Sequence, residues 1–188
     1  MLRNTHHQFL RRFVAYEPFG RLLQEGVYNC VSASALFALL LEDLGYPCQP
    51  YETPFHLYLL VEYRPGKKLL LETTDPYAGL VSGKRAVARR VARYSRPDAT
   101  DWCAKAALCT VAQGEVCPTQ FSQPINLKEL AGLQCVNQAI RYYNRLEFSQ
   151  ARYWLQKAEM LYPTSRRISG LKNYLAREEA RVKDLSLH

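Results

Sequence analysis

The sequence predicts an α+β fold, in which a helix that begins at a cysteine packs on an antiparallel sheet and a helical segment follows. Three observations support this. A long apolar run starts at Cys30, two strand-like runs joined by a short turn follow it, and residues 127–183 are helical in pattern almost throughout. We place the boundary between a core, residues 1–122, and a helical segment, residues 123–188.

The core helix is predicted over residues 30–44, with the sequence CVSASALFALLLEDL. Gly45 and then Pro47 follow it, a usual helix stop. Another helix is predicted over residues 5–15. Adjacent residues on a helix point about 100° apart, so we expect His6 and His7 to lie at the surface rather than to bind one metal ion.

Three strands are predicted, over residues 48–52, 56–63 and 68–74. The second and third (HLYLLVEY and KLLLETT) are rich in β-forming residues and enclose the turn sequence Arg64-Pro65-Gly66-Lys67. They are therefore expected to form a hairpin. The stretch from Ser95 to Pro124 is predicted to be rich in loops.

The helical segment has the residue spacing of one tetratricopeptide (TPR) unit. The positions are Ala139, Tyr142, Ala151, Leu155, Ala158 and Pro163. Small residues let two antiparallel helices approach closely, and the proline ends the second helix. One such unit cannot bury both of its faces, so we expect it to pack on the core or to bind a protein partner. A plain helical hairpin is the alternative.

The composition is that of a soluble globular protein. Apolar residues make up 48% and charged residues 22%, and no apolar run of 18 residues is present, so no membrane span is expected. The N-terminus has no signal-peptide pattern. The compartment stays open between cytoplasmic and exported with a signal peptide already removed.

The formal net charge is +8, and basic residues gather in a predicted helix around residues 84–96. Arg85, Arg89 and Arg93 are candidates for anion binding, although a solvated helix face is the simpler interpretation. No base-stacking or groove-reading motif accompanies the charge. Nucleic acid is therefore not an expected partner.

Cys30 has the position that a nucleophilic thiol requires. At a helix N-terminus, the macrodipole and the unpaired N–H groups stabilise thiolate over thiol, and the same N–H groups can bind an oxyanion. By itself, Cys30 could equally be a small apolar residue of the core.

His56 and Asp75 are predicted to face each other across the hairpin. If residues 64–67 close the turn, Tyr63 faces Lys68, and the same register places His56 opposite Asp75, with Cβ atoms about 5 Å apart. A carboxylate at that distance can orient an imidazole and stabilise its charged form. Taken singly, His56 could be a strand-end histidine and Asp75 a turn initiator.

The segments YNCVSASALFALLLEDLGY, TPFHLYLLVEY and LLLETTDPYAG, within residues 26–79, resemble bacterial transglutaminase-like proteins of the papain-like clan. The resemblance implies a papain-like core and a catalytic triad of Cys30, His56 and Asp75. Members of the clan include peptidases, amidases, acyl transferases and inactive scaffolds. The tryptophan that animal transglutaminases place near the oxyanion has no counterpart here, which argues against protein cross-linking.

The expected function is thiol-dependent acyl transfer, with hydrolysis of an amide or peptide bond and no cofactor. Gln24 lies six residues before Cys30, the spacing at which papain-type enzymes keep an oxyanion-hole glutamine. The alternative is a catalytically inactive transglutaminase-like module that serves as a protein-interaction scaffold.

The remaining cysteines do not predict a metal site. Cys103, Cys109 and Cys117 lack the close CxxC pairs and nearby histidines of a zinc site. Cys48 and Cys135 are expected in the core.

Overall fold

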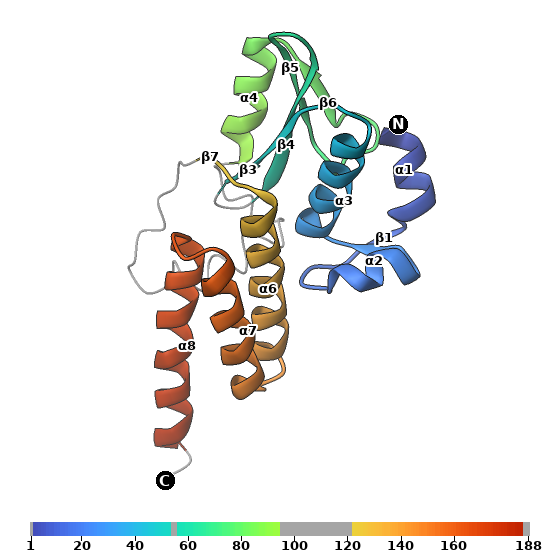
Figure 1. Ribbon diagram of the computed structural model, residues 1–188. Coiled ribbons are helices and arrows are strands. Elements are labelled where there is room, and N and C mark those ends of the chain that lie inside the picture. The colour runs from blue at the N-terminus through green and yellow to red at the C-terminus, as the bar shows by residue number, and fades with distance from the viewer. Residues whose placement is uncertain (1, 54–55, 95–121, 186–188) are drawn as a thin grey trace.

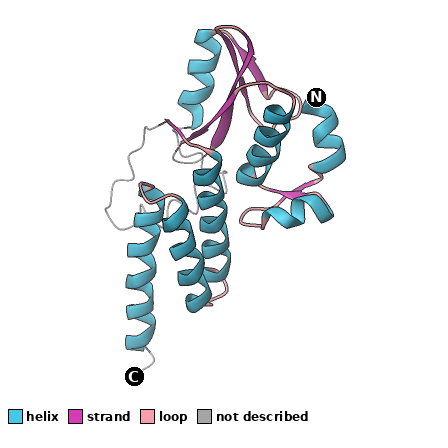
Figure 2. Ribbon diagram, viewed as in Figure 1, coloured by secondary structure: helices cyan, strands magenta, loops and turns pink. Residues whose placement is uncertain are grey.

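The computed structural model describes residues 2–53, 56–94 and 122–185, and within them the chain has the predicted α+β class (Figures 1 and 2). An antiparallel sheet has the strand order β6-β5-β4-β3-β7. Its strands are β3 (Cys48–Glu52), β4 (Leu57–Arg64), β5 (Lys67–Leu71), β6 (Leu80–Ser82) and β7 (Gln123–Pro124). Strands β3 and β4 match the predicted bounds closely, β5 ends three residues before the predicted end at residue 74, and the short edge strands β6 and β7 were not predicted.

The hairpin of β4 and β5 forms, but its register differs from the prediction. Arg64 pairs with Lys67 at the turn, whereas Glu62, and not Tyr63, pairs with Lys68. The register shifts between Glu62 and Arg64, as at a β-bulge, which places one extra residue in β4. From that point on, the predicted pairing is wrong by one residue.

Helix α3 (Cys30–Asp43) packs on one face of this sheet, as Figure 1 shows. Its buried side chains meet alternate residues of β4 and β5, as the period of two in a strand requires. The shared cluster includes Leu36, Phe37, Leu41, Leu59, Val61 and Leu71. Helix α4 (Lys84–Tyr94) lies on the other side of the sheet (Figure 1).

The N-terminal part differs from the prediction of one helix over residues 5–15. Helix α1 (Leu2–Phe9) ends earlier, and β1 (Arg12–Phe13) pairs in parallel with β2 (Val27–Tyr28), on either side of helix α2 (Phe19–Glu25). This pairing with a distant segment overrides the helical pattern of residues 10–15.

His6, which we expected at the surface, is buried with 6% of its surface exposed. Its Nε2 atom lies 2.7 Å from the carbonyl oxygen of Thr73, and its ring meets Tyr28 edge-on. The expectation was wrong because α1 packs against the chain just beyond β5. Burial lowers the pKa of His6.

The C-terminal segment forms three helices, α6 (Leu127–Tyr143), α7 (Phe148–Leu161) and α8 (Arg166–Leu185), which Figure 1 shows side by side. Ala139, Ala151 and Ala158 are all buried, as expected for small residues between close helices. At Gly132, an added Cβ would lie 2.8 Å from the Cβ of Tyr162, so α6 also approaches the end of α7 too closely for a side chain there.

The two parts of the chain share one hydrophobic cluster. It contains Cys30 and Leu57 from the core and Leu130, Val136 and Leu155 from the helices. In addition, β7 at the start of the segment predicted over residues 123–188 pairs with β3 of the sheet. The helical segment is therefore built onto the core.

None of the helices in the described part of the chain combines the length and the apolarity that a membrane span needs.

Candidate active site

Asn29 is the cap that starts α3 at Cys30. Its side chain accepts a hydrogen bond from Ser32 N at 2.9 Å, and the Ser32 hydroxyl accepts one from Asn29 N at 2.9 Å, which completes a capping box. The Asn29 side-chain amide donates to the carbonyl oxygen of Glu17 at 2.9 Å. The same carbonyl accepts a hydrogen bond from Gln134 of α6 at 2.6 Å. The start of α3 is thus held from two directions.

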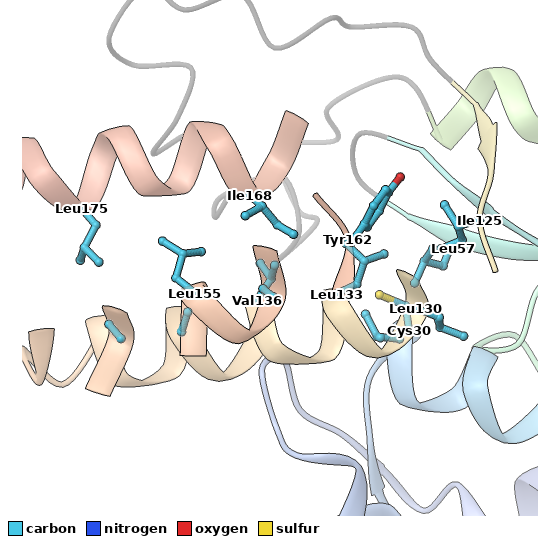
Figure 3. Packing of buried hydrophobic residues seen from close by; sticks show 14 residues of the cluster. Cys30, Leu57, Ile125, Leu130, Leu133, Val136, Leu155, Tyr162, Ile168 and Leu175 are labelled. Carbon is cyan, nitrogen blue, oxygen red and sulfur yellow. The ribbon is translucent and has the colours of Figure 1, made fainter. Parts of the chain in front are cut away.

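Cys30 is buried, with 7% of its surface exposed. Figure 3 shows its side chain at one end of the hydrophobic cluster, with Leu57, Leu130 and Tyr162 around it. Leu57 directly follows His56 in the chain. The cysteine and the histidine therefore lie on segments that meet at the same end of the sheet.

His56 lies at the base of β4, where the chain turns back from β3. Thr53 N donates to the carbonyl oxygen of His56 at 2.9 Å, and the Thr53 hydroxyl donates to the same oxygen at 2.8 Å. In return, His56 N donates to the Thr53 hydroxyl at 2.9 Å. These three bonds fix the backbone of His56 relative to the end of β3.

The imidazole of His56 pairs with Glu72. The Nε2 atom of His56 lies 2.5 Å from Oε2 of Glu72, and the two side chains are only 15% and 4% exposed. The other carboxylate oxygen of Glu72 accepts hydrogen bonds from the backbone N–H of Thr74 at 3.0 Å and from its hydroxyl at 2.7 Å. Glu72 is therefore fixed by its own turn and holds one ring nitrogen of His56.

The electrostatics of the pair favour an ionised Glu72. Burial alone would raise the pKa of this carboxyl, but the positive charge of His56 and the hydrogen bonds that the carboxylate accepts outweigh burial and lower the pKa to about 2. A carboxylate that stays ionised can stabilise a protonated imidazole beside it.

Tyr94, at the end of α4, covers the histidine. Its ring centroid lies 4.7 Å from that of His56 and 5.8 Å from that of Tyr58, which in turn stacks on Tyr51 at 5.3 Å. Burial, together with the negative charge of Glu72, raises the pKa of the Tyr94 phenol. The pair of His56 and Glu72 thus lies beneath an aromatic side chain.

Asp75 does not hold the position that we predicted for it. Strand β5 ends at Leu71, so Asp75 lies in the following turn, where Oδ1 accepts hydrogen bonds from Tyr77 N at 3.1 Å and Ala78 N at 2.8 Å. Its Oδ2 lies 3.7 Å from a guanidinium nitrogen of Arg90. Glu72, and not Asp75, binds Nε2 of His56.

Sequence reasoning missed Glu72 because the register was counted from the turn. Leu59 pairs with Leu71, so one further pair places Glu72 beside Tyr58, and His56 lies two residues away on the same face. Such diagonal neighbours are within reach of long side chains. The available signal was a single glutamate directly after a run of three leucines, followed by Thr73 and Thr74.

The other predicted site residues are dispersed. Gln24 is exposed on α2, and Arg85, Arg89 and Arg93 are exposed along α4. Cys103, Cys109 and Cys117 lie outside the described residues. Within the described residues, no group of three or more potential metal ligands occurs.

Comparison with known proteins adds no identification. No protein-family model matches the sequence, and neither a curated protein nor a solved structure is significantly similar to the chain.

Proposed function

We propose that the protein is a thiol-dependent acyl-transfer enzyme that hydrolyses an amide or peptide bond, with Cys30 as nucleophile, His56 as base and Glu72 as the residue that orients His56. The observation that carries the proposal is the buried pair of His56 Nε2 and Glu72 Oε2 at 2.5 Å. It lies at the end of the sheet where Cys30 starts α3. A nucleophile, a base and an orienting carboxylate are the three parts that such chemistry needs.

The proposed reaction uses the two ring nitrogens differently. Glu72 holds Nε2, so Nδ1 would take the proton from the Cys30 thiol while the sulfur attacks the carbonyl carbon. The backbone N–H groups at the start of α3 would bind the oxyanion. His56 would then pass the proton to the leaving amine, which yields an acyl-enzyme. Water, deprotonated by His56, would attack the thioester and release the acid and free Cys30.

This proposal includes a papain-like core of the transglutaminase type and a TPR-like C-terminal segment. Its support is the arrangement of a cysteine at the start of a helix, a histidine just before the first hairpin strand and a carboxylate just past the end of the next. Relative to the predicted triad, Glu72 takes the role expected of Asp75.

A second candidate function is a catalytically inactive module that binds a protein partner. The burial of Cys30 among Leu57, Leu130 and Tyr162 favours it, because an apolar environment disfavours the thiolate and leaves little of the sulfur exposed to a substrate. In this case Cys30 serves as a small core side chain.

Alkylation of Cys30 by iodoacetamide, followed against pH by peptide mass spectrometry, separates the two. The enzyme proposal expects fast labelling at pH 6 that is lost in His56→Ala. Cys48 and Cys135 are internal controls, since burial raises the pKa of both thiols. If Cys30 labelling rises only near the free-thiol pKa of about 8.5 and ignores His56→Ala, the enzyme proposal is wrong and the binding module is favoured.

A further inference from the structure

A buried polar network connects the helical segment to the segment that bears His56. Glu52, the last residue of β3, is 1% exposed. The Tyr162 hydroxyl, from the end of α7, donates to Glu52 Oε2 at 2.9 Å, and Gln123 Nε2 lies 3.3 Å from the same oxygen. A buried carboxylate needs such partners, because a buried charge without them is costly.

Arg167, in the first turn of α8, supplies the positive charge and one further contact. Its Nε lies 3.3 Å from Glu52 Oε1, an ion pair without the geometry of a hydrogen bond. A different guanidinium nitrogen donates to the carbonyl oxygen of Thr53 at 3.1 Å. Arg167 therefore spans two successive residues, the second of which is bonded three times to the backbone of His56.

We propose that Arg167 is a positioning residue for His56. Helix α8 then takes part in the site through two successive contacts, from Arg167 to Thr53 and from Thr53 to His56. Only the expected effect on Cys30 reactivity rests on the proposed function; the positioning of His56 does not. A guanidinium can bind Glu52 and the Thr53 carbonyl at the same time because its donors form a rigid planar fork. A lysine ammonium is a single point charge and can replace the ion pair without reproducing both contacts.

Arg167→Lys therefore separates positioning from plain charge compensation. We compare it with Arg167→Ala and with the control Lys172→Ala, which removes a positive charge from the same helix where Lys172 pairs with exposed Glu159 at 2.8 Å. Thermal unfolding confirms that each variant is folded. The ¹H and ¹⁵N resonances of the His56 ring report its contact with Glu72, and the alkylation rate of Cys30 at pH 6 reports the catalytic consequence.

Arg167→Lys is expected to unfold at the same temperature as the control variant and to shift the His56 ring resonances. Labelling of Cys30 should slow about tenfold, because small misplacements of catalytic groups are costly. Lys172→Ala should leave both readouts unchanged. Unchanged His56 resonances in folded Arg167→Lys would overturn the positioning role. If wild-type Cys30 is unreactive at pH 6, the proposed enzyme function fails, but the His56 spectrum still decides the role of Arg167.

Discussion

Glu72 binds Nε2 of His56 at 2.5 Å, with both side chains largely buried under Tyr94. The sequence suggested Asp75 for this position. The difference concerns function, because the carboxylate that touches the imidazole is the one that can fix its orientation and stabilise its charge. The two acids lie only three residues apart in the chain. Because they have different partners, their roles can still be separated by experiment.

Replacement of each acid by its amide tests which one supports Cys30. Glu72→Gln keeps the shape of the side chain but removes the charge beside His56, so we expect Cys30 alkylation at pH 6 to slow by at least about tenfold. Asp75→Asn can still accept the hydrogen bonds from Tyr77 and Ala78, so its labelling rate should stay within about twofold of the wild type. The reverse order of effects would return the orienting role to Asp75.

The acid dependence of stability should carry the signature of Glu72. Its pKa is depressed from the ordinary 4.5 to about 2 in the folded chain, so the ionised carboxylate stabilises the fold above about pH 4.5. That contribution, about 3 kcal/mol in full, is lost as the pH falls from about 4.5 to about 2.

Urea unfolding at pH 6 and pH 3 measures this effect. The free energy of unfolding of the wild type should fall between the two pH values by about 2 kcal/mol more than that of Glu72→Gln, because the amide does not titrate. Equal losses in both proteins would mean that Glu72 is not held ionised in the fold.

Gly79 is required where the turn after β5 returns to Glu72. Glu72 N donates to the Gly79 carbonyl oxygen at 2.7 Å, and an added Cβ at Gly79 would lie 2.3 Å from Asp75 O and 2.4 Å from Glu72 O. Backbone atoms cannot yield as a flexible side chain can. We expect Gly79→Ala to destabilise the protein by about 2 kcal/mol or more and to slow Cys30 labelling.

Gly20→Ala is the matched control for Gly79→Ala. Gly20 lies in α2, where an added Cβ meets nothing within 4 Å. Alanine there should stabilise the chain by roughly 0.5–1 kcal/mol, because it restricts the unfolded state and favours the helix. The unfolding temperature should therefore fall in Gly79→Ala and rise in Gly20→Ala. If it falls in neither variant, the steric role of Gly79 is wrong.

The cap at Asn29 should contribute more than an ordinary helix cap. Asn126 forms the same kind of capping box at the exposed start of α6, with Glu129 as its partner. Asn126→Ala should cost about 1 kcal/mol of unfolding free energy. Asn29→Ala should cost about 2 kcal/mol, because Asn29 is buried and also binds the Glu17 carbonyl. Urea unfolding gives both values, and equal costs would contradict the added role.

Local pattern was sufficient for most of the core. The apolar run after Asn29 specified α3 almost to the residue, and β3 was predicted with the bounds that it has. In β4, Leu59 and Val61 face α3, as the period of two in a strand requires, and Tyr58, which precedes Leu59, is buried against Tyr94. By contrast, residues 12 and 13 favoured a helix by pattern and became β1 through pairing with β2.

By itself, the sequence determined that Cys30 starts a helix and that a strand begins directly beside His56, because caps and residue periodicity act within a few residues of chain. Only the tertiary structure decided which acid reaches His56, because a register shift of one residue near the hairpin turn changes every pairing beyond it. It also decided that Arg167 lies against Thr53, across 114 residues of chain. Such a contact depends on how α8 packs on the core, which no local pattern specifies.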